Sequence, residues 1–110
     1  MLVLTRRIGE AIRIGDDVRL TVQARLRHHI TLGVTAPGLT ELLVEDATVT
    51  PRVLSGGRRF YLVPLLTGES VRIGEIEIRV CFDTAWASGR QVRLAIAAPR
   101  SVPVHREEVY

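Results

Sequence analysis

The sequence has no lysine, a single cysteine, few aromatic residues and no long apolar run. One cysteine excludes an internal disulfide framework and is typical of proteins in a reducing compartment. Aromatic residues make up 5% of the chain, so a buried core has to be mainly aliphatic. No apolar run approaches the about 20 residues of a membrane-spanning helix, and none at the start is long enough for a signal peptide. We therefore expect a soluble domain that works in the cytoplasm.

The residues that are present indicate one globular core and suit an anionic partner. The 110 residues are 46% hydrophobic, which is too apolar for a disordered tail, and the length is that of a single domain. All 15 basic residues are arginine, and the formal net charge is +3. Genomic base composition explains the absence of lysine, but so does a need for guanidinium groups, which suit phosphates and base edges. Both explanations stay open.

Apolar and polar residues alternate along four segments, at residues 18–23, 30–34, 76–80 and 92–96. Alternation of period two is typical of β-strands with one buried face. Glycines and acidic pairs fall between these segments, where turns are expected. No segment combines a helical apolar stripe with caps at both ends, and one helical turn around Glu107 is the most that we expect. The pattern predicts an all-β fold with little or no helix.

An internal repeat divides the chain into two halves. The segment GEAIRIG at residues 9–15 returns as GESVRIG at residues 68–74, and an Ala-Pro step follows each copy. The copies are offset by about 59 residues at the first landmark and by about 62 at the second. This difference predicts a small insertion in the second half, between Asp83 and Gly89.

Neither half is large enough to form a stable domain alone. We expect unit one at residues 1–48, a linker at residues 49–58 and unit two at residues 59–110. A unit of about 50 residues rarely closes its own core, and its four or five strands leave sheet edges unpaired. Two halves that share one core and exchange their edge strands avoid both problems. The sequence thus predicts a single-chain pseudodimer, a β-sandwich or barrel made of two fused copies.

Both ends of the chain carry motifs of one known family. The opening MLVLTRRIGE, followed by IGD at residues 14–16, and the closing APRSVPVHREEVY closely resemble the carbon storage regulator family, CsrA/RsmA (carbon storage regulator / repressor of secondary metabolites). The resemblance covers nearly the whole chain, as two bacterial family units in tandem. It implies that each unit contributes five strands and that the two units swap their outer strands.

The resemblance also implies a function and a site. Family members bind a GGA triplet in the loop of an RNA hairpin, in an mRNA leader or a small regulatory RNA, and block translation initiation. The site lies where the first strand of one unit meets the fifth strand of the other. The matching residues here are Leu4, Thr5, Arg6, Arg7, Ala98, Pro99, Arg100, Ser101, Val102, Val104, His105 and Arg106. Arginines suit phosphates and stacked bases, whereas backbone groups of the last segment would read the guanines.

The two copies have lost opposite parts of this site. Where unit one has LTRR at residues 4–7, unit two has VPLL at residues 63–66. Where unit two has VHR at residues 104–106, unit one has LLV at residues 42–44. Because each family site combines strands from both units, these losses leave one intact basic site and one apolar site. We expect one working RNA site per chain.

Other functions stay open at this point. The apolar residues Leu42, Leu43, Leu65 and Leu66 could form a docking surface for a protein partner or a second copy of the chain. A protein with one working site could also compete for RNA and so modulate a two-site relative. No catalytic motif, phosphate-binding glycine loop or usable set of metal ligands occurs. We therefore expect no enzyme activity, no cofactor and no metal.

Overall fold

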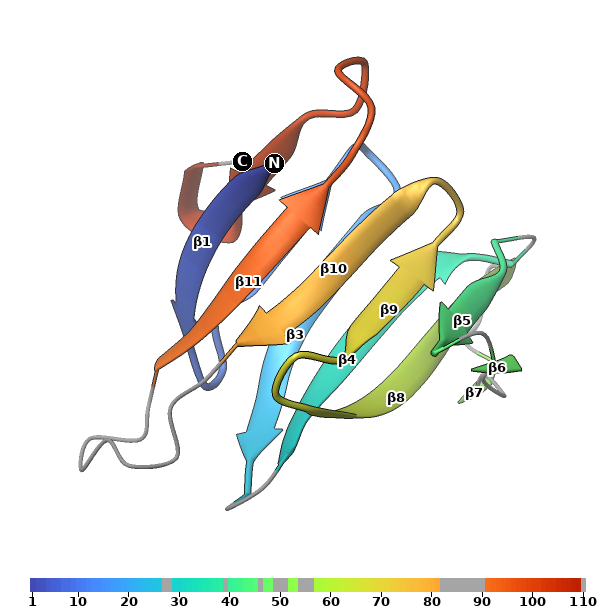
Figure 1. Cartoon of the computed structure of the whole chain (residues 1–110). Helices are drawn as coiled ribbons and strands as arrows, with labels where there is room; N and C mark the ends of the chain where they lie inside the picture. Colours follow the sequence, from blue (N-terminus) through green and yellow to red (C-terminus); the bar gives the residue numbers. More distant parts are fainter. Residues whose placement is uncertain are drawn as a thin grey trace.

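The fold is a sandwich of two antiparallel β-sheets, shown in Figure 1 for a computed structural model of the whole chain. The structure describes residues 1–26, 29–38, 40–45, 47–48, 52–53, 57–81 and 91–109. The prediction of an all-β fold is confirmed, since the described residues contain one short 3₁₀ turn, η2 (Glu107–Val109), and no α-helix. That turn lies where the sequence allowed a last helical turn. No helix in this described part is long and apolar enough to cross a membrane.

Each sheet has six strands among the described residues. The first sheet contains, in spatial order, β1 (Leu2–Arg7), β11 (Gln91–Ala97), β10 (Ile76–Cys81), β9 (Ser70–Ile73), β5 (Leu42–Val44) and the short β6 (Ala47–Thr48). The second contains β12 (Val104–Arg106), β2 (Ala11–Ile14), β3 (Val18–Arg25), β4 (His29–Pro37), β8 (Arg58–Leu66) and the short β7 (Arg52–Val53). The interval 49–58, expected to be a linker, therefore contributes β7 and the first residue of β8.

The expected exchange of outer strands between the two units is confirmed. The centre of each sheet consists of three consecutive strands from one unit, either β2 to β4 or β9 to β11. The other unit supplies the flanking strands, so β1 pairs with β11 and β5 with β9 in one sheet. In the other sheet β8 pairs with β4 and β12 pairs with β2. Each unit thereby closes the edges that the other leaves open, as unpaired edges would favour aggregation.

The core lies between the two sheets and is formed by the inward residues of the alternating strands. Every second residue of β11 points inward, and Val92, Leu94 and Ile96 are at most 2% exposed. Ile30, Leu32 and other residues of β4 complete the same core from the opposite sheet. Burial of one such side chain contributes about 1.5–3 kcal/mol. Since both units supply this single cluster, neither unit has a separate core.

The repeated glycines form equivalent turns in the two units. Gly9 and Gly68 have φ values of 89° and 85°, in the left-handed region that favours glycine. The carboxylate of Glu10 accepts a hydrogen bond from the backbone N–H of Arg7 at 2.7 Å. In the second unit, the carboxylate of Glu69 accepts the equivalent hydrogen bond from the backbone N–H of Leu66 at 2.6 Å. The repeat that is visible in the sequence is thus a repeated turn geometry. The insertion predicted between Asp83 and Gly89 lies outside the described residues.

We predict that Leu94→Ala destabilises the whole molecule by about 2–5 kcal/mol, because it leaves a cavity in the shared core. Leu94 is 0% exposed, whereas Leu26, which is 56% exposed, provides a matched control. Leu26→Ala should change the free energy of unfolding by less than about 0.5 kcal/mol. Urea unfolding followed by circular dichroism measures both values. Two separate transitions, one for each unit, would contradict the shared core.

Candidate functional site

The two ends of the chain lie together at one end of the sandwich (Figure 1). β1 is the edge strand of the first sheet, and β12 is the edge strand of the second. These edges lie one over the other, because the side chain of Arg6 in β1 contacts Glu108 just after β12. The segments that carry the two family motifs are therefore brought together, although about one hundred residues of chain separate them.

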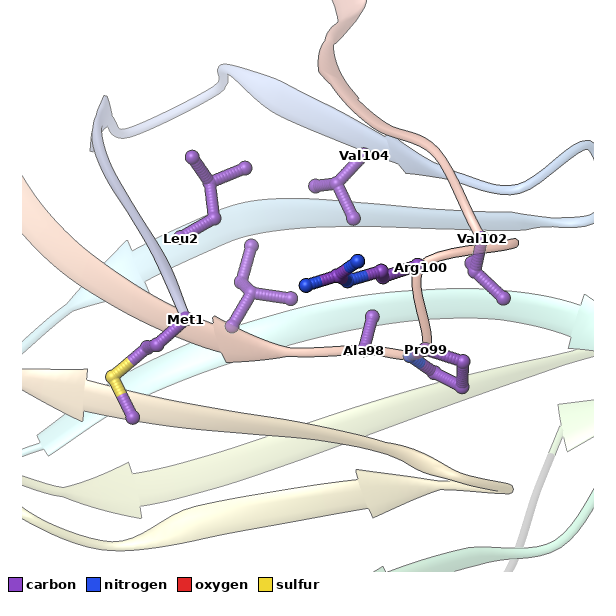
Figure 2. A pocket seen from close by; sticks show the side chains of 8 residues that line it. Met1, Leu2, Ala98, Pro99, Arg100, Val102 and Val104 are labelled. Carbon is purple, nitrogen blue, oxygen red and sulfur yellow. The ribbon is translucent and has the colours of Figure 1, made fainter.

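A hollow of about 290 Å³ opens between these edges and is shown in Figure 2. It is lined by Met1, Leu2, Ile96, Ala98, Pro99, Arg100, Val102 and Val104. We call it the terminal groove. Its size is near the lower end of the about 300–1,000 Å³ range of small-ligand pockets. A lining that combines aliphatic side chains, polar backbone groups and one cationic side chain suits a flat aromatic group with polar edges and a negative charge nearby.

The loop between β11 and β12 gives the terminal groove its shape. The backbone N–H of Val102 donates to the carbonyl of Pro99 at 3.0 Å, which closes a tight turn. The carbonyl of Pro103 accepts a hydrogen bond from the N–H of Gly15 at 2.7 Å, which attaches this loop to the turn between β2 and β3. Figure 2 shows the side chain of Arg100 extending from the turn across the hollow, with Val104 on one side and Ala98 on the other.

The site residues expected from the sequence differ in whether they line the groove, are exposed or are buried. Ala98, Pro99, Arg100, Val102 and Val104 line the terminal groove. Thr5, Arg7, Ser101, His105 and Arg106 are exposed on the strands and the loop that carry this lining. Leu4 packs against the hydrophobic core, and Arg6 is buried. The sequence thus identified the right segments but not which side chain of each segment points into the hollow.

Arg6 is 5% exposed, and its contacts are inside the protein. Its Nη1 and Nη2 atoms lie 3.0 Å from the two carboxylate oxygens of Glu108, a bidentate pair. Hydrogen bonding to Glu108 raises the pKa of Arg6. The same hydrogen bonds are the main cause that lowers the pKa of Glu108 from 4.5 to about 2, and the charges of Arg6 and Arg106 add to the effect.

The neighbouring carboxylate fixes the end of the chain to the second sheet. Arg19 in β3 donates from Nε and Nη2 to the two oxygens of Glu107, at 2.5 and 2.9 Å. Arg13 in β2 adds an ion pair with Nε 3.5 Å from the Oε1 atom. The pKa of Glu107 is lowered, chiefly by the hydrogen bonds from Arg19. Both acidic residues of the tail therefore act within the protein, where they dock η2 onto its neighbours.

Three residues of the groove lining, Met1, Leu2 and Ile96, were not expected as site residues from the sequence. An exposed arginine, Arg93, also lies on the outer face of β11. Period-two alternation was the available signal, since Leu2 shares a face with Leu4 and Arg93 alternates with the buried Val92 and Leu94. Arg93 pairs with Thr5 in the ladder between β11 and β1, so its exposed side chain lies beside the outer face of β1. No group of three potential metal ligands occurs in the part of the chain that the structure describes.

The equivalent end of the sandwich, formed by β5 and β8, corrects one expectation. Leu42 is 1% exposed and Leu65 is 0% exposed, so both belong to the core and cannot form a docking surface. They turn inward because each alternates with outward neighbours, and burial of a leucine is favourable. Of the four apolar residues proposed for docking, Leu43 is half-buried and Leu66 is 50% exposed. The expected contiguous apolar patch is thus wrong.

Tyr61 fills this second end. It pairs with Val34 at the ladder position where Leu2 pairs with Ile96 at the first end. The ring is 2% exposed, and its hydroxyl donates to the carbonyl of Thr40 at 3.2 Å. Tyr61 therefore reaches from β8 to the loop before β5, across the place equivalent to the terminal groove.

The chain between the units also covers this second end. β6 pairs with the outer edge of β5, and β7 pairs with that of β8. Gly38, which occupies the place equivalent to Arg100, is packed against the linker: a Cβ atom there would lie 2.5 Å from the carbonyl oxygen of Gly57. No side chain fits at this position without a shift of the backbone. A cation equivalent to Arg100 is therefore sterically excluded.

Comparisons with known proteins agree with this geometry. The model of the CsrA global regulator protein family matches residues 1–45 and 66–110. The translational regulator CsrA of Hydrogenovibrio crunogenus (strain DSM 25203 / XCL-2) is 54% identical over 46 residues. That alignment covers 42% of this chain and 66% of the length of the relative, just under two thirds. No solved structure matches the chain.

Two units that exchange their outer strands around one core, with both family motifs at a shared groove, define a tandem β-sandwich. The chain belongs to the CsrA global regulator protein family and contains two family units in one polypeptide. This is a family of regulators rather than of enzymes. The second match begins at residue 66, the last residue of β8. Most of β8, the strand that carries Tyr61, therefore lies outside both matched segments.

We predict that the Glu108 ion pair makes stability depend on pH in acid. Because folding lowers the pKa of this carboxyl from 4.5 to about 2, its contribution is present above pH 4.5 and is lost as the pH falls toward 2. Thermal unfolding of wild type and Glu108→Gln at a series of pH values measures this contribution. The midpoint of wild type should be higher at pH 6, and the difference should shrink below pH 4.5. A difference that is constant down to pH 2.5 would contradict the prediction.

Proposed function

We propose that the chain is a post-transcriptional regulator that binds a GGA triplet in the loop of an RNA hairpin and blocks translation initiation. The observation that carries this proposal is the terminal groove, which the two family motifs form together. The relative from Hydrogenovibrio crunogenus is a translational regulator. Such a function places the protein where ribosomes are, in the cytoplasm, with an mRNA leader or a small regulatory RNA as its ligand.

The groove offers each chemical group that a splayed RNA loop needs. Its apolar lining, with Leu2 and Val104, suits the face of an unstacked base. The turn at residues 98–102 presents backbone N–H and C=O groups that can pair with a guanine edge. Exposed arginines suit phosphates, and we assign this role to Arg100 in the groove lining and to Arg7 and Arg106, which are exposed on β1 and β12. Arg6 supports the site from inside, since Glu108 already holds its guanidinium.

One RNA per chain follows from the difference between the two ends. The second end has Leu65 where the first has Arg6, and Tyr61 lies across the place of the groove. Gly38, packed against Gly57, stands in place of Arg100. A chain with one site cannot bridge two hairpins of one transcript and therefore gains no avidity from a second contact.

A role as an RNA competitor is the second candidate function. A one-site chain that occupies a GGA loop without bridging would displace a two-site relative from single hairpins. Both functions would use the terminal groove, so the presence of this groove supports them equally. Docking of a protein partner has less support, because Leu42 and Leu65 are core residues.

We predict that Arg106→Ala weakens the binding of a GGA hairpin by about 1–3 kcal/mol, the value of a charge-assisted contact. Arg106 is 51% exposed, and its Nε atom lies 3.8 Å from Glu108, so one face of the guanidinium is open to RNA. The slope of log Kd against log salt concentration should also decrease, by the contribution of about one phosphate contact. Fluorescence anisotropy with a GGA hairpin and a GGA-scrambled control measures both effects. Wild-type affinity in the variant would remove Arg106 from the site.

We predict that native mass spectrometry of the full chain with excess GGA hairpin gives one RNA per chain. The physical reason is that Tyr61 and the linker fill the second end. Arg106→Ala should reduce the abundance of this complex, whereas Leu66→Ala, at the surface of the second end, should leave it unchanged. A complex of one chain with two RNAs would contradict the proposal of a single site.

A further inference from the structure

The terminal groove lies between two strands that do not pair with each other. β1 belongs to the first sheet and β12 to the second, and in the described ladders no backbone hydrogen bonds join them. Leu2, the first residue of β1, and Val104, the first residue of β12, both line the groove. The width of the groove therefore depends on side chains that connect the two edges rather than on sheet geometry.

The pair of Arg6 and Glu108 makes this connection. The two parallel contacts of 3.0 Å fix distance and orientation together, which a single hydrogen bond does not do. The rest of the guanidinium is also engaged, because Nε donates to the carbonyl of Thr5 at 3.0 Å and Nη1 approaches the carbonyl of Ala11 at 3.4 Å. A guanidinium that is 5% exposed needs these partners, since an unpaired buried charge is unfavourable.

We propose that Glu108 is a positioning residue for RNA binding, whose carboxylate holds β1 and Arg106 at the spacing that the groove requires. This inference rests on the proposed function. One Glu108 oxygen, Oε1, lies 3.0 Å from the Nη2 atom of Arg6 and 3.8 Å from the Nε atom of Arg106. The carboxylate thus connects the buried arginine of one sheet to the exposed arginine of the other.

The adjacent Glu107 provides a matched control. It has the same charge and lies in the same 3₁₀ turn. Its contacts, however, are with Arg13 and Arg19 on β2 and β3, which belong to the same sheet as β12. Loss of Glu107 loosens the tail on its own sheet, whereas loss of Glu108 removes the bidentate contact between the edges of the two sheets and leaves Arg6 with only the carbonyl of Ala11 as a partner in the second sheet.

Electrostatics and positioning predict opposite signs for Glu108→Gln. RNA is a polyanion, so removal of a nearby negative charge should by itself tighten binding. If Glu108 positions the groove, the variant should instead bind a GGA hairpin more weakly, by on the order of tenfold, which corresponds to about 1.4 kcal/mol. The salt dependence of binding should not decrease, because no phosphate contact is lost. Glu107→Gln should bind as wild type or slightly more tightly.

The experiment uses the full chain and fluorescence anisotropy with a GGA hairpin, with circular dichroism to check the fold of each variant. Arg6→Lys is the second variant, since it keeps the charge but loses the two-pronged contact, and it should show the same loss of affinity. If Glu108→Gln is unfolded, Arg6→Lys carries the test. Unchanged or tighter binding by the folded variant would overturn the inference, as would an equal loss in Glu107→Gln.

A second measurement separates this inference from the proposed function. In the free protein, the methyl chemical shifts of Leu2 and Val104 should change in Glu108→Gln and stay close to wild type in Glu107→Gln. If wild type does not bind the hairpin, the proposed function fails, and these shifts still report whether Glu108 sets the groove. Unchanged shifts in Glu108→Gln would refute the positioning role whatever the result with RNA.

Discussion

Pairing of sheet edges across the two halves is the constraint on which the rest of the structure depends. Three consecutive strands from either half leave both edges of their sheet open, and the other half supplies the missing strands. The ladder between β1 and β11 runs over the whole length of β1, from Leu2 to Arg7. This exchange places the start of the chain on one sheet and its end on the other. The terminal groove is a consequence of this arrangement, and neither half contains it alone.

A groove between two sheets needs a connection that backbone hydrogen bonds do not provide. The acidic tail provides this connection, and its two carboxylates contact different sheets. Glu107 binds within the second sheet, and Glu108 binds across to Arg6 in the first. The two bidentate pairs are partly exposed, so their net contribution to folding is smaller than their short distances suggest. Their effect lies more in geometry, because a fork of two contacts fixes orientation.

The sequence predicted the strands, the repeat and the meeting of the two ends. Alternation was sufficient for β3, β4, β10 and β11, since a period of two places their valine, leucine and isoleucine residues on one face. The same rule applied to β1 shows that Arg6 lies on the inward face with Leu4, so the burial of Arg6 was accessible from the sequence. The identity of its partner was not, because Glu108 is distant in the chain. The role of Tyr61 also depends on a contact, with Thr40, that no local pattern predicts.

Fusion of the two units allows the two ends of the sandwich to differ. Two identical chains would place the same residue at both ends, whereas here one inward position holds Arg6 at one end and Leu65 at the other. Arg6 needs a carboxylate in order to be buried, but Leu65 is buried without any polar partner. At the end where Leu65 takes the position of Arg6, a tail carboxylate has no buried guanidinium at that position to hold. The chain turns back there as β6 and then β7, along the outer edges of β5 and β8. Leu65 in place of Arg6, Tyr61 across this end, and β6 and β7 along its edges are consistent with one another, because apolar packing here needs no charged partner.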